Sequence, residues 1–373
     1  MKHDITLILH LTDACNLACS YCYCKHNLDK NSYSEQVIVD CIKRCIDYNE
    51  KGLRVILHGG EPLLIGVNKM RLILQESVNY SLKQSKHLSF SLQTNLTLLD
   101  EEYCKLLSEY NVKIGTSLDG YNEYQNSSRI TNNGSMTFSK VFNTIIHLQK
   151  SRNYKQLCPG IIVTITKKHI GKEQELLDFI RDNNLKCSIR PAFPINDNEK
   201  CNCMLPDEYA KFFCNMFDLW FVDSVYRTFD IQEFPQIIEL LLFKRSTKSL
   251  CSNSQNCGRN FICANELGDF YSCNRLCNIS NFYLGNVYTD EISKIIINNS
   301  NFCKNRFDAL KECKKCKWLA ICNGGCPANA FFASGSYNNK DYFCQAKLII
   351  YNHVEQVLKK HFDTYKFETL FNG

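Results

Sequence analysis

Three cysteines near the N-terminus constrain this chain more than any other feature. Cys15, Cys19 and Cys22 form a CX3CX2C pattern directly after a short apolar segment. Three thiolates on one tight loop can ligate three irons of a cubane cluster and leave the fourth iron without a protein ligand. Because a cluster that serves only in electron transfer normally has four protein ligands, the pattern predicts that another molecule completes the coordination.

Clustered cysteines also serve as disulfides, zinc ligands and buried thiols. The chain has 23 cysteines, an odd number, in 373 residues. No secretory signal is expected, because the apolar run from Ile5 to Leu11 contains His10 and is followed by Asp13. Thiols stay reduced in the cytosol, so we expect no disulfides. Zinc is the open alternative, with Cys24 or His26 as a fourth ligand of the N-terminal loop.

Composition excludes several classes of protein. The net charge of +6 is mild, and no long basic block is interleaved with aromatic residues, so nucleic-acid binding is not expected. The apolar run from Ile237 to Phe243 contains Glu239 and is far too short to cross a bilayer. We therefore expect a cytoplasmic protein with no membrane segment. One dense basic patch, Lys311 to Lys317, is expected to offset the negative charge of a nearby thiolate cluster.

Strand and helix signals alternate over the first 230 residues or so. Short β-branched runs predict strands at Ile5–Leu11, Leu53–Leu57, Leu88–Leu92, Val112–Thr116, Gly160–Ile165 and Cys187–Arg190. Amphipathic stretches predict helices at Ser34–Tyr48, Asn68–Leu82, Glu101–Glu109, Phe138–Lys150, Lys172–Asn183 and Asp207–Tyr226. Such alternation favours parallel strands joined by right-handed crossovers. The predicted fold is α/β, a partial (β/α)6 barrel of the TIM type.

Polar motifs follow four of the predicted strands. They are Cys15–Cys22, the GGEP segment Gly59-Gly60-Glu61-Pro62, Gln93–Asn95 and Ser117–Gly120. Since the chemistry of parallel barrels sits at the carboxyl ends of the strands, these motifs should converge. The glycine pair lets the backbone approach a ligand closely, and Glu61 suits a bound ammonium group.

The CX3CX2C loop with Tyr21, followed one βα unit later by GGEP, resembles the signature of radical S-adenosylmethionine (SAM) enzymes. In that family the open iron chelates SAM, and an electron from the cluster cleaves SAM to a 5′-deoxyadenosyl radical. The resemblance implies SAM contacts from Tyr21, Gly59, Gly60, Glu61, Pro62, Asn95, Ser117 and Arg129. Arg129 suits a carboxylate by bidentate pairing, and a solvated loop arginine is the alternative.

Cysteines become dense again in the last third. Cys257, Gly268 and Cys273 precede a CX2CX5CX3C run and one further cysteine, which resembles the seven-cysteine signature of SPASM domains, and Cys251 supplies an eighth. Resemblance to sulfatase-maturing enzymes implies two auxiliary 4Fe-4S clusters, one on Cys251, Cys257, Cys273 and Cys326 and one on Cys313, Cys316, Cys322 and Cys344. Two four-cysteine zinc sites are the alternative.

Around these cysteines the sequence predicts a hairpin turn at Gly268–Ser272 and a short strand at Leu284–Val287. The predicted domains are a barrel over 1–230, a linker helix over 231–250 that includes Lys244–Ser249, a SPASM domain over 251–350, and a C-terminal helix and tail over 351–373. The resemblance implies three 4Fe-4S clusters in all, one of which binds SAM.

The resemblance is closest to anaerobic sulfatase-maturing enzymes and related peptide maturases. It implies hydrogen abstraction from a peptide or protein, with an external electron donor such as flavodoxin or ferredoxin. In sulfatase maturases an aspartate after the cysteine equivalent to Cys273 accepts the substrate proton, whereas this chain has Asn274, which does not titrate. We therefore expect a maturase that forms a thioether or carbon-carbon crosslink. A formylglycine-forming sulfatase maturase is the alternative, and a non-catalytic electron carrier is the alternative from another class.

The remaining cysteines have no predicted cluster role. Among them are Cys24, Cys201, Cys203, Cys263 and Cys277. We expect buried or incidental thiols. For Cys201 and Cys203, which follow the sixth predicted strand, hydrogen donation or substrate contact is the alternative.

Overall fold

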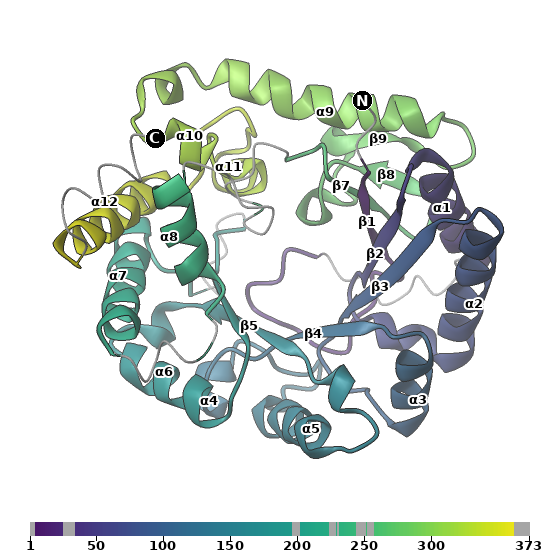
Figure 1. The fold of residues 1–373 in the computed structure, drawn as a ribbon, viewed down its shortest axis with the longest axis horizontal. Coiled ribbons are helices and arrows are strands. Elements are labelled where there is room, and N and C mark those ends of the chain that lie inside the picture. Colours follow the sequence, from purple (N-terminus) through teal and green to yellow (C-terminus); the bar gives the residue numbers. More distant parts are fainter. Residues whose placement is uncertain are drawn as a thin grey trace. The chain divides into compact units, whose positions relative to one another are not determined.

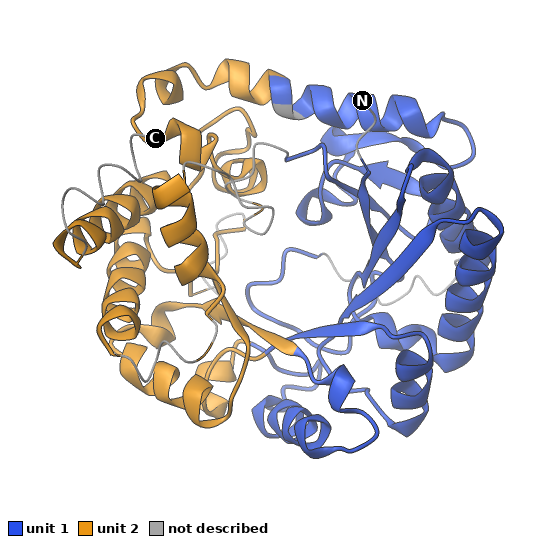
Figure 2. Ribbon diagram, in the orientation of Figure 1, with its two compact units in different colours: residues 1–117, 129–159, 256–304 blue, residues 118–128, 160–255, 305–373 orange. Residues whose placement is uncertain are grey.

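The computed structural model describes residues 4–24, 34–195, 202–223, 229, 231–243, 251 and 257–361. The chain forms two compact units (Figure 2). The first comprises residues 1–117, 129–159 and 256–304, and the second comprises residues 118–128, 160–255 and 305–373. The linear domain boundaries expected from the sequence stay a prediction. Within them, residues 244–250 of the linker and residues 362–373 of the tail lie outside the described residues.

The first unit is built on a mixed sheet in the order β4-β3-β2-β1-β7-β8-β9 (Figure 1). The strands are β1 (Thr6–His10), β2 (Gly52–His58), β3 (His87–Gln93), β4 (Lys113–Ser117), β7 (Phe261–Ala264), β8 (Asp269–Tyr271) and β9 (Tyr283–Asn286). Strands β1 to β4 and β7 are parallel, and β8 and β9 continue the sheet antiparallel.

The register separates two faces of this sheet. Leu7 pairs with Val55 and Leu9 with Leu57, and all four side chains are buried on one face. Because side chains alternate along a strand, His10 and its register partner His58 lie on the opposite face.

Helices of the first unit cover the leucine-bearing face of its sheet. They are α1 (Glu35–Tyr48), α2 (Val67–Lys83), α3 (Glu101–Glu109) and α5 (Phe138–Lys150), and α9 (Ile292–Ala309) crosses into the second unit after Lys304. Figure 1 shows α1, α2 and α3 beside β1 to β3. The side chain of Ser34 caps α1 by accepting from the N–H of Gln36, and that of Asp100 caps α3 by accepting from the N–H of Tyr103.

The second unit pairs two parallel strands with a set of helices. The strands are β5 (Gly160–Ile165) and β6 (Cys187–Pro191); the helices are α4 (Glu123–Asn126), α6 (Glu173–Asp182), α7 (Pro206–Val222), α8 (Glu233–Phe243), α10 (Leu319–Cys322), α11 (Pro327–Ser334) and α12 (Cys344–His361). Helix α12 packs on α7, where His353 Nε2 lies 2.7 Å from Asp218 Oδ1.

The predicted α/β fold is confirmed. Each predicted strand and helix of the first 230 residues has its counterpart within a residue or two, apart from the last predicted helix: α7 ends at Val222, and residues 224–226 lie outside the described residues. The cysteine-rich region does contain a hairpin, formed by β7 and β8, but its turn lies at residues 265–268 and not at Gly268–Ser272, because Asp269–Tyr271 is strand β8. The strand predicted at Leu284–Val287 is present as β9. The sequence did not indicate that β7 pairs in parallel with β1.

Short 3-10 turns connect several of these elements. Two of them carry site residues, η1 (Pro62–Ile65) and η7 (Asn274–Leu276). Among the helices that the structure describes, none is both long and apolar enough to traverse a bilayer.

Candidate active site

The cysteine loop Cys15–Cys22 is held against the segment that begins at Arg129. The N–H of Ala18 donates to the carbonyl of Ile130 at 2.8 Å, and Asn132 Nδ2 donates to the carbonyl of Cys15 at 3.0 Å. Arg129 Nη1 donates to Tyr21 Oη at 2.9 Å, and Arg129 is buried. These hydrogen bonds fix the position of the cysteine loop, and the Arg129 guanidinium is bonded to Tyr21, the residue before Cys22.

The thiols of this loop suit metal ligation. The N–H of Leu17 lies 3.4 Å from Cys15 Sγ as a hydrogen-bond donor. Burial raises the pKa of Cys15 to about 12, so without a metal this thiol holds its proton at neutral pH. Because a thiolate is the form that binds iron, cluster assembly displaces that proton. The donor set of three cysteines on one loop fits a 4Fe-4S cluster with one iron left open.

The glycine pair packs against the chain just before the cysteine loop. The N–H of Gly60 donates to the carbonyl of Thr12 at 2.7 Å, and the N–H of Glu61 donates to the carbonyl of Ala14 at 2.8 Å. A Cβ at Gly60 would lie 2.1 Å from the carbonyl oxygen of Ala14. Glycine is therefore required here by a close approach between two backbone segments of the protein, a role that the sequence did not reveal.

Glu61 joins the ends of two strands. It is fully buried, and its Oε1 accepts from the N–H of Leu63 at 3.0 Å and from Thr94 Oγ1 at 2.7 Å. Its Oε2 accepts from the N–H of Asn95 at 2.7 Å. Burial raises the pKa of this carboxyl, and the three hydrogen bonds oppose that shift. Both oxygens thus have partners inside the protein, and the expected contact of Glu61 with an ammonium group stays a prediction.

The other predicted SAM contacts lie in the same unit. Asn95 Oδ1 accepts from the N–H of Thr97 at 2.9 Å, and Asn95 Nδ2 donates to Asn16 Oδ1 at 2.9 Å, within the cysteine loop. Ser117 is the last residue of β4 and is half-buried. Pro62 begins the turn η1. Within the first unit, the structure therefore brings the cysteine loop, the GGEP segment, Asn95 and Ser117 to one end of the parallel strands, and the individual SAM contacts stay predictions.

A group of polar side chains at the ends of β1 and β2 was missed by the sequence analysis. Asn274 lies at its centre: its Oδ1 is 2.5 Å from His10 Nε2, and its Nδ2 is 2.6 Å from Tyr23 Oη and 3.3 Å from His58 Nε2. The rings of His10 and His58 are stacked, with centroids 5.7 Å apart. Burial lowers the pKa of His58 to about 3, so this ring is neutral at physiological pH. His10 and His58 each lie at the carboxyl end of a parallel strand, where the sites of such barrels lie. The sequence could have indicated them as site residues on that basis.

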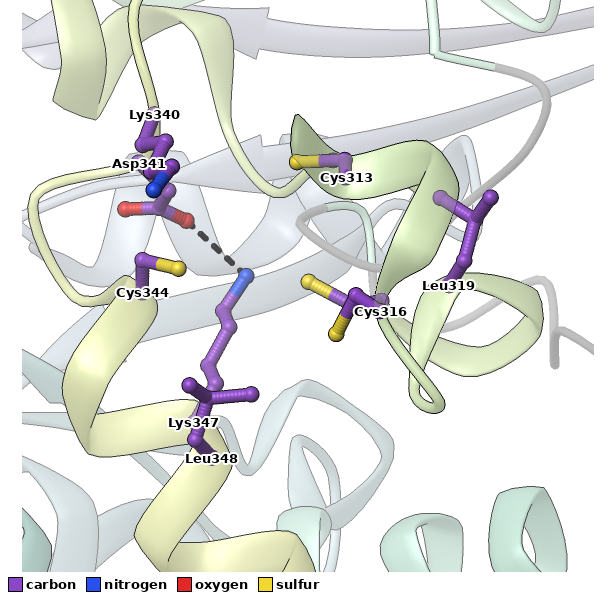
Figure 3. A pocket seen from close by; sticks show the side chains of 10 residues that line it. Cys313, Cys316, Leu319, Lys340, Asp341, Cys344, Lys347 and Leu348 are labelled. Atoms are coloured by element: carbon purple, nitrogen blue, oxygen red, sulfur yellow. Dashed lines mark ion pairs between the residues drawn. The ribbon is translucent and has the colours of Figure 1, made fainter. Parts of the chain in front are cut away.

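Four of the C-terminal cysteines line one pocket in the second unit. Cys313, Cys316, Cys322 and Cys344 surround it together with Asp341 and Lys347, and Figure 3 shows the labelled sulfurs facing a shared space between α12 and the segment before α10. Lys347 Nζ lies 2.9 Å from Asp341 Oδ2. Four thiolates around one space fit a fully ligated 4Fe-4S cluster.

The lysines beside this pocket differ from those expected. Lys340 and Lys347 line it, whereas none of the lysines of the 311–317 patch does. Lys317 instead lies 3.8 Å from Glu355. The positive charge that offsets the thiolates therefore comes from around the last cysteine ligand.

The other predicted auxiliary ligands are divided between the units. Cys257 and Cys273 belong to the first unit, and Cys251 and Cys326 belong to the second, so their common cluster stays a prediction. Cys326 is buried, and its N–H donates to Asp341 Oδ2 at 2.8 Å. Cys201 and His26 lie outside the described residues. Cys203 is disulfide-bonded, which corrects the expectation that the chain has no disulfides.

Comparisons with known proteins agree with this geometry. Residues 9–180 match the model of the radical SAM superfamily. A cysteine-type anaerobic sulfatase-maturating enzyme of Clostridium perfringens (strain 13 / Type A) is 30% identical over 91% of this chain and 93% of its own length. A serine-type anaerobic sulfatase-maturating enzyme of Bacteroides thetaiotaomicron is 25% identical over 91% of this chain and 86% of its own length.

A solved structure extends the similarity to the whole fold. Native anSMEcpe with bound AdoMet and Cp18Cys peptide superposes with a TM-score of 0.84 and 26% identity, and the match covers 95% of this chain and 98% of that one. The cysteine loop, the GGEP turn and the α/β fold define a radical SAM enzyme. Within that class, the chain belongs to the family of anaerobic sulfatase-maturating enzymes, which carry three 4Fe-4S clusters and bind SAM.

Proposed function

We propose that this enzyme oxidises a cysteine side chain of a peptide or protein substrate by two electrons to a thioaldehyde, which water converts to the aldehyde of formylglycine with release of hydrogen sulfide. One electron leaves with the hydrogen atom that the SAM-derived radical takes, and an auxiliary cluster would accept the other as the proton is released. The similarity to a peptide-bound relative along nearly the full chain carries this proposal. The relative with 30% identity is of the cysteine type, which favours cysteine over serine as the target residue. Sulfatase maturation is thus better supported than the crosslinking reaction that the sequence favoured.

The proposed ligands divide into three sets. Cys15, Cys19 and Cys22 hold the cluster that binds SAM; the first auxiliary cluster takes Cys251, Cys257, Cys273 and Cys326, and the second takes Cys313, Cys316, Cys322 and Cys344. When bound, SAM and its cluster supply a 5′-deoxyadenosyl radical that takes a hydrogen atom from the substrate. We also propose a reduced flavodoxin or ferredoxin as electron donor, and a cytoplasmic location.

The proton released in this oxidation requires an acceptor other than Asn274. An amide has no acidic or basic form near neutral pH. Among the residues that the structure describes, the side chains hydrogen-bonded to Asn274 are His10, His58 and Tyr23, and none of these three is a carboxylate. The rate of the reaction should therefore be limited by proton transfer more strongly than in an enzyme with an aspartate at this position.

Peptide oxidation tests the proposal directly. The reduced, reconstituted enzyme is incubated with SAM and a peptide that contains Cys-x-Pro-x-Arg, and a matched peptide carries alanine in place of the cysteine. We expect methionine, 5′-deoxyadenosine and an aldehyde that a hydrazide reagent traps only on the cysteine peptide. The Cys15→Ala variant serves as the control without SAM cleavage.

Asn274 favours one second candidate, the formation of a thioether or carbon-carbon crosslink. In that case the same incubation gives a peptide that has lost two hydrogens, retains its sulfur and does not react with the hydrazide. That result, or SAM cleavage with the peptide unchanged, would contradict the assignment to cysteine oxidation.

A further inference from the structure

Three potential metal ligands outside the predicted cluster sets meet in the first unit. His10 ends β1, Cys263 lies in the adjacent strand β7, and Cys277 follows the turn η7. A ring nitrogen of His10 and the two sulfur atoms lie within 4.8 Å of one another. Cys263 is the register partner of Ile8, two residues before His10, so both side chains project from the same face of the sheet.

The histidine of this group has one ring nitrogen that makes no hydrogen bond, and this nitrogen is ion-paired with Asp13 at 3.8 Å when the ring is protonated. His10 is 2% exposed, and its Nδ1 makes no hydrogen bond within the described part of the chain. A buried polar atom left in this state costs free energy unless a ligand satisfies it. The other ring nitrogen, Nε2, is 2.5 Å from the Asn274 side-chain oxygen. A histidine that binds a metal through one nitrogen typically donates its second N–H to such an oxygen.

A carboxylate lies next to this nitrogen. Asp13 Oδ1 is 3.8 Å from His10 Nδ1, too far for a hydrogen bond. Asp13 Oδ2 accepts from Asn278 Nδ2 at 2.7 Å, and Asn278 directly follows Cys277. This hydrogen bond therefore links Asp13 to the segment that carries Cys277, and it also orients the Asp13 carboxylate.

The geometry points to a fourth metal centre: we propose that His10, Cys263 and Cys277 bind a single Zn²⁺ ion, with Asp13 as the fourth ligand. Two thiolates, one imidazole and one carboxylate form a donor set that suits zinc in tetrahedral coordination. With zinc-ligand bonds of about 2.0–2.3 Å, ligand atoms lie within roughly 4 Å of one another, so His10, Cys263 and Cys277 need only a small contraction. Asp13 is not part of the group whose ligand atoms lie within 4.8 Å of one another, so its carboxylate must move closer to bind the same ion. The ion would join β1, β7 and the segment that carries Asn274.

Two other cysteines of the same unit are buried outside this group of ligands. Cys41 and Cys45 are fully buried on α1, and neither belongs to a potential metal-binding group among the described residues. Burial of a cysteine alone thus does not mark a site in this protein. The combination of two thiols, an imidazole nitrogen that makes no hydrogen bond and an oriented carboxylate distinguishes the group around His10.

The test uses Co²⁺ as a spectroscopic probe for zinc. The holoprotein, with its iron content already measured, is dialysed against Co²⁺ without oxygen. We expect about one cobalt per chain, thiolate-to-cobalt charge-transfer bands and an unchanged iron content. Cys277→Ser and Cys263→Ser should each lower cobalt binding at least tenfold. The matched controls Cys158→Ser, for a half-buried thiol, and Cys45→Ser, for a fully buried one, should bind cobalt as the wild type does.

Three outcomes would overturn the proposal. One is the absence of both bound zinc and bound cobalt in the wild-type holoprotein after the dialysis. Another is a loss of iron equal to the cobalt gained, which would place the cobalt in a cluster site. The third is undiminished binding by both Cys277→Ser and Cys263→Ser. If Cys263→Ser does not fold, the proposal is decided by the number of cobalt ions bound per wild-type chain and by cobalt binding to Cys277→Ser, whose substituted residue is only half-buried.

Discussion

At the scale of single residues, Glu61 is a structural tie between strand ends. Its carboxylate accepts three hydrogen bonds, two of them from backbone N–H groups, while it is fully removed from water. A glutamine at this position would place its NH2 group where one of the Glu61 oxygens now accepts a hydrogen bond, so two hydrogen-bond donors would face each other. The turn after β2 and the turn after β3 are therefore held together through a single side chain.

Glu61→Gln should lower the free energy of unfolding by about 2 kcal/mol, because a hydrogen bond to a charged, buried acceptor is lost and a donor is left unpaired. Anaerobic denaturant unfolding of the holoprotein measures the effect. Glu102→Gln, on the exposed side of α3, is the matched control and should change the value by less than about 0.5 kcal/mol. If Glu61→Gln and Glu102→Gln had the same free energy of unfolding, the hydrogen bonds of Glu61 would not stabilise the two strand ends.

Arg129 is expected to serve SAM binding from a fixed position. Arg129→Lys removes the planar donor group that lies 2.9 Å from Tyr21 Oη. The dissociation constant for SAM should rise about tenfold, equivalent to about 1.4 kcal/mol, with the iron content unchanged. Equilibrium dialysis against labelled SAM measures it, and Tyr21→Phe, which keeps the guanidinium, should have the smaller effect. An unchanged constant in Arg129→Lys would remove this residue from the SAM site.

Asn274→Asp restores a titratable group beside His58 and Tyr23. If cysteine oxidation is limited by proton transfer, the rate of aldehyde formation should rise by roughly 10-fold or more. The ratio of aldehyde to 5′-deoxyadenosine should rise with it, which separates a better base from faster SAM cleavage. An unchanged rate would mean that another group already accepts the proton efficiently.

At the scale of elements, α12 contributes both a predicted ligand, Cys344, and the cation that offsets the thiolates. Lys347 Nζ is 2.9 Å from Asp341 Oδ2, and the Lys347 side chain is 14% exposed. Asp341 also accepts from the N–H of Cys326. Loss of Lys347 leaves a buried carboxylate beside four thiolates without its counter-charge.

Lys347→Met should therefore destabilise the second unit by about 3–5 kcal/mol, the usual cost of removing one partner of a buried ion pair. Iron content should fall by about a third, since one of three clusters is affected. Lys317→Met is the control, because Lys317 is 63% exposed and lies 3.8 Å from Glu355. Full iron content in Lys347→Met would contradict the role assigned to this lysine.

The sequence predicted the strands and helices of the first 230 residues because apolar periodicity is a local signal. The cysteine loop and GGEP were found for a similar reason, as short motifs with fixed spacing. The partners of Glu61 and the group around Asn274 join segments far apart in the chain, and no local pattern specifies them. The parallel pairing of β1 with β7 likewise joins segments far apart in the chain, so no local pattern predicts it.

At the scale of the whole molecule, the clusters should contribute to stability as well as to chemistry. Anaerobic removal of iron with a chelator leaves buried thiols without metal and the pocket of the second unit without contents. The apoprotein should unfold at a lower temperature and over a broader range than the holoprotein. Calorimetry on both forms measures this, and the same midpoint for both would show that the polypeptide is stable without its metals.

The pairing of β7 with β1 also affects the order in which the protein can be made. During synthesis β1 emerges well before β7, so one of its two neighbours is absent until Phe261–Ala264 has left the ribosome. Until then the nascent chain carries an open strand edge, and such edges associate with other chains. Ribosomes that release the chain before Phe261 should therefore yield a product that aggregates through the unpaired edge of β1.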